Sequence, residues 1–342
     1  MAPINTNNVF IRLQEQSVRE RSFLESSFVD NGEIARLNEE RVDDVANPIL
    51  ETTLDQRVSG RGRRCSTSPK DSLFMALTVM KHFSTWDKHA ADFGFKAPTF
   101  EKLIMRVVMT IEPLFSEQLI VCPTMTSLTA ASRRFSNFPY ALYTVDVKFQ
   151  PSLRPTGRFA EQKHYFSGKH HMYGYKIEAA VSPDGRCVAM SDAHPGSVHD
   201  LTILHTRREL HTTNLTKSAC EAAMPDHGEL SAEYTATWAC LVDMGYIGVD
   251  HTLRGIHPKR SPQNVALDVA DVERNRRVSS DRVVVESFFG RVCSLWKIYG
   301  VIQRTTFALT NFHISLMPVR AEDEVYYALI MARYQGMANE HK

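Results

Sequence analysis

The sequence predicts an α/β protein in which a mixed sheet flanked by helices follows a small helical unit. Apolar residues recur every three or four positions between about 68 and 115, which is typical of amphipathic helices. From about 140 apolar and polar residues alternate, which is typical of half-buried strands, and a helical pattern returns after 280. Strands and helices interspersed in this way predict a layered α/β domain.

We expect three parts along the 342 residues. Residues 1–66 form a helical and flexible N-terminal region, 67–135 the helical unit, and 136–335 the α/β domain. A helical segment is predicted from Val9 to Phe28. The segment Arg57–Arg64 holds four arginines and two glycines, which predicts a flexible basic linker.

The helical unit carries clear start signals. Ser68 is the predicted N-cap of its first helix, with Pro69 at the first helical position and Asp71 in the first turn. A second short helix is expected from Thr85 to Phe93, and a third after Thr99. Three short helices in this order are typical of helix-turn-helix DNA-binding units, although such units also occur without DNA. The side chains expected to face outward near the third helix are Lys96, Thr99, Lys102 and Arg106.

The α/β part is read from alternation and turn residues. A helix is expected to start at Ser197, where residues 197–200 resemble a capping box, and a polar insertion follows over 209–235. The predicted strands are Tyr143–Phe149, Tyr175–Val181, Arg186–Ser191 and Thr237–Val242.

Composition gives only weak guidance to function. With 40 basic and 39 acidic residues the net charge is +1, which does not by itself favour a nucleic-acid partner. A second basic stretch, Lys259-Arg260 with Arg274–Arg277, either contacts DNA or lies in a solvated loop. No apolar run approaches the ~20 residues of a membrane span and no secretory pattern opens the chain, so we expect an intracellular protein without membrane contact.

Three carboxylates predict a metal site. Asp146 lies within an otherwise apolar strand, where an unpaired carboxylate is costly unless it meets a partner, a metal or solvent. Asp243 follows a buried strand, at the kind of strand end where ligands collect. Glu286 lies on a helix that Ser280 is expected to cap, just outside its apolar stripe and one turn before Gly290. Hard oxygen ligands from separate elements suit two Mg²⁺ ions flanking a phosphodiester.

Each of these acids also has an ordinary explanation, as an exposed strand residue, a turn residue or a solvated helix residue. Asp200 competes with Asp243 for the second position, or supports the site as a further metal-binding acid. Other candidates for metal or DNA contacts lie nearby or on the same helix, each with a solvated or core alternative: His194, His199, Lys169, His170, His171 and Trp296.

Six segments resemble the DDE superfamily endonucleases of the PIF/Harbinger transposase type, and they occur in that family's order. They are Tyr143–Asp146, Tyr165–His171, Tyr173–Glu178, His194–Asp200, Leu241–Tyr246 and Arg282–Gly290. The family often has Gly-Thr after its first Asp, where this chain has Val147-Lys148. The resemblance implies an RNase H-like core, with Asp146, Asp243 and Glu286 as the catalytic, metal-binding triad.

The implied function is Mg²⁺-dependent cleavage of DNA at element ends, with Mn²⁺ as a second possible cation, followed by joining of the 3′ hydroxyl to target DNA. The resemblance also implies a nuclear location, a Myb-like DNA-binding partner protein and a homo-oligomer. Two alternatives stay open: a domesticated DNA-binding protein without catalytic activity, and an RNase H-fold nuclease that does not transpose.

Overall fold

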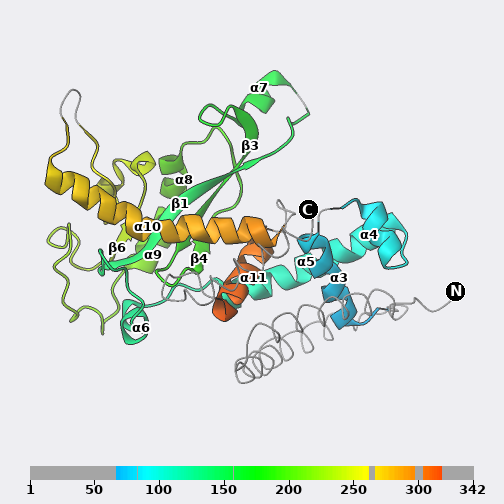
Figure 1. Cartoon of the computed structure of the whole chain (residues 1–342), viewed down its shortest axis with the longest axis horizontal. Helices are drawn as coiled ribbons and strands as arrows, with labels where there is room; N and C mark the ends of the chain where they lie inside the picture. The colour runs from blue at the N-terminus through cyan, green and yellow to red at the C-terminus, as the bar shows by residue number, and fades with distance from the viewer. Residues whose placement is uncertain (1–66, 83, 157, 262–265, 297–302, 318–342) are drawn as a thin grey trace, which may run out of the picture. The chain divides into compact units, whose positions relative to one another are not determined.

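The computed structural model describes residues 67–82, 84–156, 158–261, 266–296 and 303–317 (Figure 1). The predicted Val9–Phe28 helix and the Arg57–Arg64 linker lie outside the described residues. The chain divides into two compact units, one of residues up to 114 with 295–306, and one of residues 115–294 with those from 307 on. In the part of the chain that is described, no helix has the length and apolar character needed to cross a membrane.

The three predicted helices of the first part are present as α3 (Pro69–Lys81), α4 (Trp86–Asp92) and α5 (Ala97–Leu119). The Ser68 hydroxyl accepts a hydrogen bond from the Asp71 amide at 3.1 Å, as its predicted N-cap role requires. The Thr85 hydroxyl caps α4 in the same way, accepting from the Lys88 amide at 3.2 Å. The four side chains expected to face outward are exposed: Lys96, Thr99, Lys102 and Arg106.

The second unit contains a mixed sheet with β1 (Ala141–Pro151) at its centre. β1 pairs antiparallel with β3 (Met172–Val181) and parallel with β6 (Ala239–Leu241), and β6 pairs parallel with β7 (Gly255–Ile256). Three further strands pair antiparallel with β3: β2 (Phe166–Ser167), β4 (Cys187–Met190) and β5 (His194–Pro195). This confirms the predicted mixed sheet, and the arrangement is compatible with an RNase H-like core.

Helices cover both faces of the sheet. On one face, Val278 of α10 (Val269–Leu295) packs in a cluster with Ala141, Ala239 and Leu241 of β1 and β6. The opposite face packs against α6 (Met125–Ala130), α8 (Asp200–Thr206) and α9 (Arg208–Leu215), which contribute Leu128, Leu204 and Leu215 to its core. A register shift between Ala141 and Tyr143 changes the alternation, so that Tyr143 and Val145 face this second core.

The helix that carries Glu286 begins earlier than predicted. It starts at Val269, and the side chain of Asp268 accepts a hydrogen bond from the Asp271 amide at 2.6 Å. The proposed cap Ser280 lies inside the helix, so that expectation was wrong. Ion pairs such as Arg277 with Glu273, one turn apart, stabilise the polar first half of the helix, which the apolar pattern did not reveal.

Two expectations for the middle of the chain also change. α8 begins at Asp200 with His199 at the N-cap position and no side-chain capping bond, so residues 197–200 do not form a capping box. The Ser197 amide instead donates to the His164 carbonyl at 3.1 Å. The polar insertion 209–235 is partly helical, because α9 occupies its first residues.

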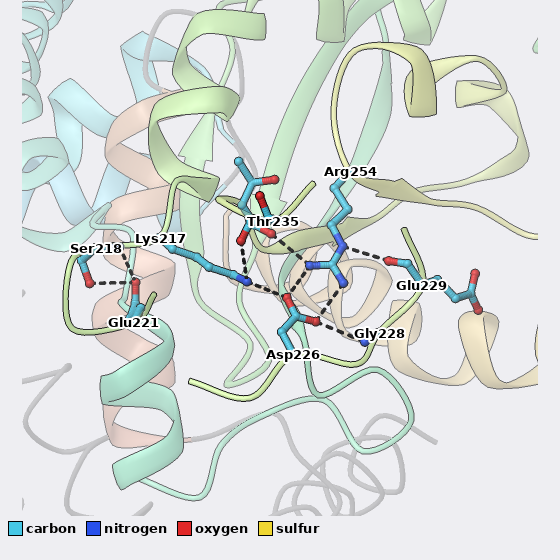
Figure 2. A network of polar contacts seen from close by, with 9 residues as sticks. Lys217, Ser218, Glu221, Asp226, Gly228, Glu229, Thr235 and Arg254 are labelled. Carbon is cyan, nitrogen blue, oxygen red and sulfur yellow. Dashed lines mark hydrogen bonds and ion pairs between the residues drawn. The ribbon is translucent and has the colours of Figure 1, made fainter. Parts of the chain in front are cut away.

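A buried ionic network holds the remainder of that insertion to the sheet (Figure 2). Asp226 accepts hydrogen bonds from Arg254 Nη2 at 2.9 Å and from Lys217 Nζ at 2.8 Å, and Arg254 Nε donates to the Glu229 carbonyl at 2.9 Å. Burial alone would raise the pKa of Asp226, but the bonds from Arg254 and Lys217 hold that pKa well below its usual range. The network therefore fixes the segment that leads back into β6.

Candidate active site

Asp146 and Asp243 lie on the same face of the sheet. Successive residues of a strand point to opposite faces, and Val145 and Val242 belong to the core on the α8 side. Their following residues, Asp146 on β1 and Asp243 just after β6, therefore point toward α10. The parallel pairing of β1 with β6 brings these two positions near one edge.

Arg282 of α10 contacts both of these acids. Its Nη1 donates to Asp243 Oδ1 at 3.1 Å, and its Nη2 lies 3.7 Å from Asp146 Oδ2. The Arg282 side chain is 7% exposed, whereas those of Asp146 and Asp243 are 26% and 44% exposed. One largely buried guanidinium thus joins two carboxylates that solvent still reaches.

The electrostatics of Asp146 are those of a partly desolvated acid among other acids. Burial raises the pKa of Asp146 to about 6, and the negative charges of Asp243 and Asp200 act in the same direction. The positive charge of Arg282 and a hydrogen bond from the Val147 amide at 2.8 Å oppose that rise. A further cation at this position would favour the ionised form of Asp146.

Glu286 lies one helical turn after Arg282, on the same side of α10. Side chains on a helix tilt toward its N-terminus, so the Glu286 carboxylate extends toward the turn that carries Arg282. Glu286 is exposed and makes no hydrogen bond or ion pair with another described residue. A side chain at Gly290, one turn on, would meet no atom within 4 Å, so the surface beside Glu286 is open.

Asp200 has a different partner. Its Oδ1 accepts from Lys176 Nζ at 2.8 Å, and that ammonium also donates to the Val198 carbonyl at 2.7 Å. Lys176 points to the face opposite Asp146, because it lies in register with Phe149. Asp200 Oδ2 approaches Gly245, which follows Asp243 by two residues, at 3.4 Å from the position of an added Cβ. The structure therefore brings Asp200 near the loop after Asp243 but not to the shared Arg282.

The remaining candidates are spread around the sheet. His194 lies on β5 and His199 at the start of α8, both beside Asp200 in the chain. Trp296 is buried, in keeping with its core interpretation. The side chains of Lys169, His170 and His171 are exposed in the turn between β2 and β3, where the His170 ring stacks on that of Phe149.

The second basic stretch is largely neutralised. Lys259 pairs with Asp271, and Arg274 with Glu229 at 2.6 Å. Arg276 and Arg277 both pair with Glu273, at 2.7 and 3.1 Å. These cations are therefore engaged within the chain.

The donor set suits a hard divalent cation. Two carboxylates, one within β1 and one just after β6, already converge on one positive charge, and oxygen ligands of this kind are those that Mg²⁺ and Mn²⁺ accept. Within the described ranges, no three His, Cys, Asp or Glu side chains are arranged as a metal-holding group. Arg282 contacts the first two acids, and Glu286 is the next acid after it along α10, one turn on.

Arg282 is a site residue that the sequence-based prediction of three carboxylates did not include. The signal was available, because a helical Arg one turn before a candidate acid faces the same surface. Two ionised carboxylates on one sheet face also require a nearby cation.

Comparison with known proteins shows which family the chain belongs to. The family model described as DDE superfamily endonuclease matches residues 145–317, which is just over half of the chain. The matched range includes Asp146, Asp200, Asp243 and Glu286. No curated protein and no solved structure matches the chain.

Proposed function

The chain belongs to the DDE superfamily endonucleases, and from this premise we propose that it cleaves DNA at a divalent-metal site formed by Asp146, Asp243 and Glu286. Family membership implies a nuclease that acts on DNA. The observation that carries the assignment is the sharing of Arg282 by Asp146 on β1 and Asp243 just after β6. Glu286 joins them because it lies one turn from Arg282 on α10.

The three acids and Arg282 would have different roles at this site. When bound, the divalent cations supply positive charge to the scissile phosphate and lower the pKa of the attacking hydroxyl or water. Asp146 and Asp243 would hold them from the relatively rigid sheet, and Glu286 from the solvent side. Arg282 keeps the first two acids together, and its charge lowers the cost of ionising Asp146 beside Asp243.

Beyond cleavage, we propose a cut-and-paste transposase of the PIF/Harbinger type, which joins a freed 3′ hydroxyl to target DNA. A nuclear location, a Myb-like partner protein and a homo-oligomer belong to the same proposal. The near-neutral net charge supports a separate partner for recognising element ends. The helix α5, with Lys102 and Arg106 exposed, is our candidate for contacts with DNA bases.

Two other functions remain alternatives. A domesticated DNA-binding protein would retain the fold without cleavage, although acids at all three positions favour an enzyme. A nuclease that does not transpose would cleave without joining strands. Terminal inverted repeats flanking the coding region would favour the transposase over both.

The test is a nicking assay on supercoiled plasmid with the purified full-length chain. We expect Mg²⁺-dependent nicking by the wild type, and a loss of at least about a hundredfold in Asp146→Asn and in Glu286→Gln. These substitutions preserve size but remove the charge that holds a hard cation. Asp250→Asn serves as the control, because Asp250 lies outside the acidic cluster.

Nicking at the wild-type rate in either triad variant would contradict the assignment. Absence of nicking by a folded wild type that binds DNA would favour the domesticated protein. Nicking without joining of a labelled 3′ end would favour the nuclease that does not transpose.

A further inference from the structure

A positively charged extension leaves the sheet directly beyond Asp146. The strands β1 and β3 continue as a two-stranded ribbon toward α7 (Phe159–Lys163), as Figure 1 shows. We define residues 148–175 as the basic arm. It carries five Lys or Arg residues against one acid, Glu161, whereas the whole chain has 40 against 39.

The cations of the basic arm have no acidic partner. Among the described residues, none of the five forms an ion pair with an Asp or Glu, and all are exposed: Lys148, Arg154, Arg158, Lys163 and Lys169. This distinguishes them from the second basic stretch, where Lys259, Arg276 and Arg277 each have an acid of the chain. Arg154 Nε donates to Gln162 Oε1 at 2.8 Å, but no carboxylate neutralises any of the five. Exposed cations without an acidic partner are available to an external anion.

The base of the arm is held by strand pairing and close packing. β1 and β3 remain paired to Pro151 and Gly174, and the Phe149 ring stacks on His170 with 4.5 Å between ring centroids. A side chain at Gly174 would place its Cβ 2.2 Å from the Gln150 carbonyl oxygen, so only glycine fits this close approach. The Gly174 amide also donates to the Tyr165 carbonyl at 2.9 Å.

Several positive charges gather around His170. Partial burial and the charges of Lys169, Lys176 and Lys148 hold the pKa of His170 below its usual range. Lys176 is bound to Asp200, but Lys148 and Lys169 have no such partner. Lys148 follows Asp146 by two positions on the same strand, so it faces the same side, about 7 Å farther along.

The arm also exposes apolar side chains. Leu153 is 93% exposed and Phe159 is 70% exposed, both near the end of the arm. Large apolar groups among cations are typical of surfaces that contact DNA grooves as well as phosphates. An acidic protein surface would satisfy the cations, but the continuity of the arm with the strand that carries Asp146 favours the DNA that this site would cleave.

We propose that the basic arm binds the phosphate backbone of duplex DNA next to the site of cleavage. This rests on the proposed function, because the DNA is the substrate of that site. Five strand residues beyond Asp146 span about 17 Å, roughly half a turn of duplex. The arm thus contacts the DNA flank on one side of the acids, and its rigid link to β1 fixes where the flank lies.

The test measures DNA affinity of the full-length chain against salt, without divalent metal. The arm variant carries Arg158→Gln, Lys163→Gln and Lys169→Gln. The matched control carries Lys259→Gln, Arg276→Gln and Arg277→Gln, and loses the same charge from cations that are paired internally. We expect the arm variant to lower the slope of log affinity against log salt by about 2 to 3, since each lost phosphate contact removes ~0.9. The control should keep a slope near that of the wild type.

An unchanged slope in a folded arm variant would overturn the proposal and would leave an acidic protein as the partner of these cations. Equal losses in both variants would also overturn it, because the effect would then follow net charge. Absence of duplex binding by the wild type would also overturn the proposal. The nicking assay tests a separate claim. A chain that binds DNA through the arm but does not nick it would support the proposed role of the arm and contradict the proposed nuclease activity.

Discussion

Asp146 shows how one residue combines stability and function. It lies in a strand between apolar neighbours, and it is partly removed from water beside two other acids. A carboxylate in this position is costly for the folded chain when no metal is bound. Its presence in the centre of the sheet is understandable if binding a cation compensates for that cost.

This cost has a pH dependence of predictable sign. The pKa of Asp146 rises from its usual 3.8 to about 6 in the folded chain, so the folded state retains a proton that the unfolded state releases. Without metal, the contribution of Asp146 to the free energy of unfolding should fall as pH rises from about 4 to about 6, by at most about 3 kcal/mol. Asp146→Asn should remove this contribution and be more stable than the wild type above pH 6.

Urea unfolding of both proteins with EDTA between pH 4 and 7 measures the effect. The difference in free energy of unfolding should grow in favour of the variant over that range. A difference that does not change with pH would show that Asp146 titrates normally.

Among the elements, α10 connects the site to the sheet. Val278 and Val285 are buried, while Arg282 between them contacts Asp146 within β1 and Asp243 just after β6. Asp281 adds a second attachment, because its carboxylate accepts from the Asn137 and Phe138 amides at 2.9 and 3.0 Å. The helix therefore depends on polar contacts as well as on apolar packing.

Arg282→Gln should destabilise the chain without metal by about 2 to 4 kcal/mol. The change removes the cation and leaves two carboxylates facing each other, but their partial exposure keeps the loss below that of a fully buried pair. Millimolar Mg²⁺ should restore part of the loss in this variant, because it replaces the missing positive charge. Urea unfolding with and without Mg²⁺ measures both effects.

Arg276→Gln is the matched control, since Arg276 lies on the same helix in an exposed pair with Glu273. It should change stability little and show no recovery with Mg²⁺. An Arg282→Gln variant as stable as this control would mean that the guanidinium does not hold the acids together.

For the molecule as a whole, the sequence predicted the mixed sheet, the strand that carries Asp146 and the strand that ends just before Asp243, because alternation and short apolar runs are local signals. It did not predict β2, β5 and β7, whose two residues each are too few to show a period. The polar start of α10 was missed because its ion pairs replace an apolar stripe. Arg282 was missed because its role depends on strands that are distant in sequence.

The family resemblance led us to propose Asp146, Asp243 and Glu286 where local patterns left the choice of acids ambiguous. Asp200 illustrates the limit, since its sequence neighbours suggested a capping box whereas the structure pairs it with Lys176. Such a pairing depends on β3 lying beside α8, which neither segment's own pattern specifies. Tertiary contacts of this kind decide which acids share a cation.

The central claim is that Asp146, Asp243 and Glu286 bind the same divalent metal ions. The most direct measurement is a titration of the full-length chain with Mn²⁺, in which electron paramagnetic resonance measures the concentration of the free ion. We expect binding by the wild type that Mg²⁺ displaces, and affinity at least tenfold weaker in Asp146→Asn, Asp243→Asn and Glu286→Gln. Asp250→Asn should bind as the wild type does, and unchanged Mn²⁺ affinity in the Asp243→Asn variant would contradict the claim.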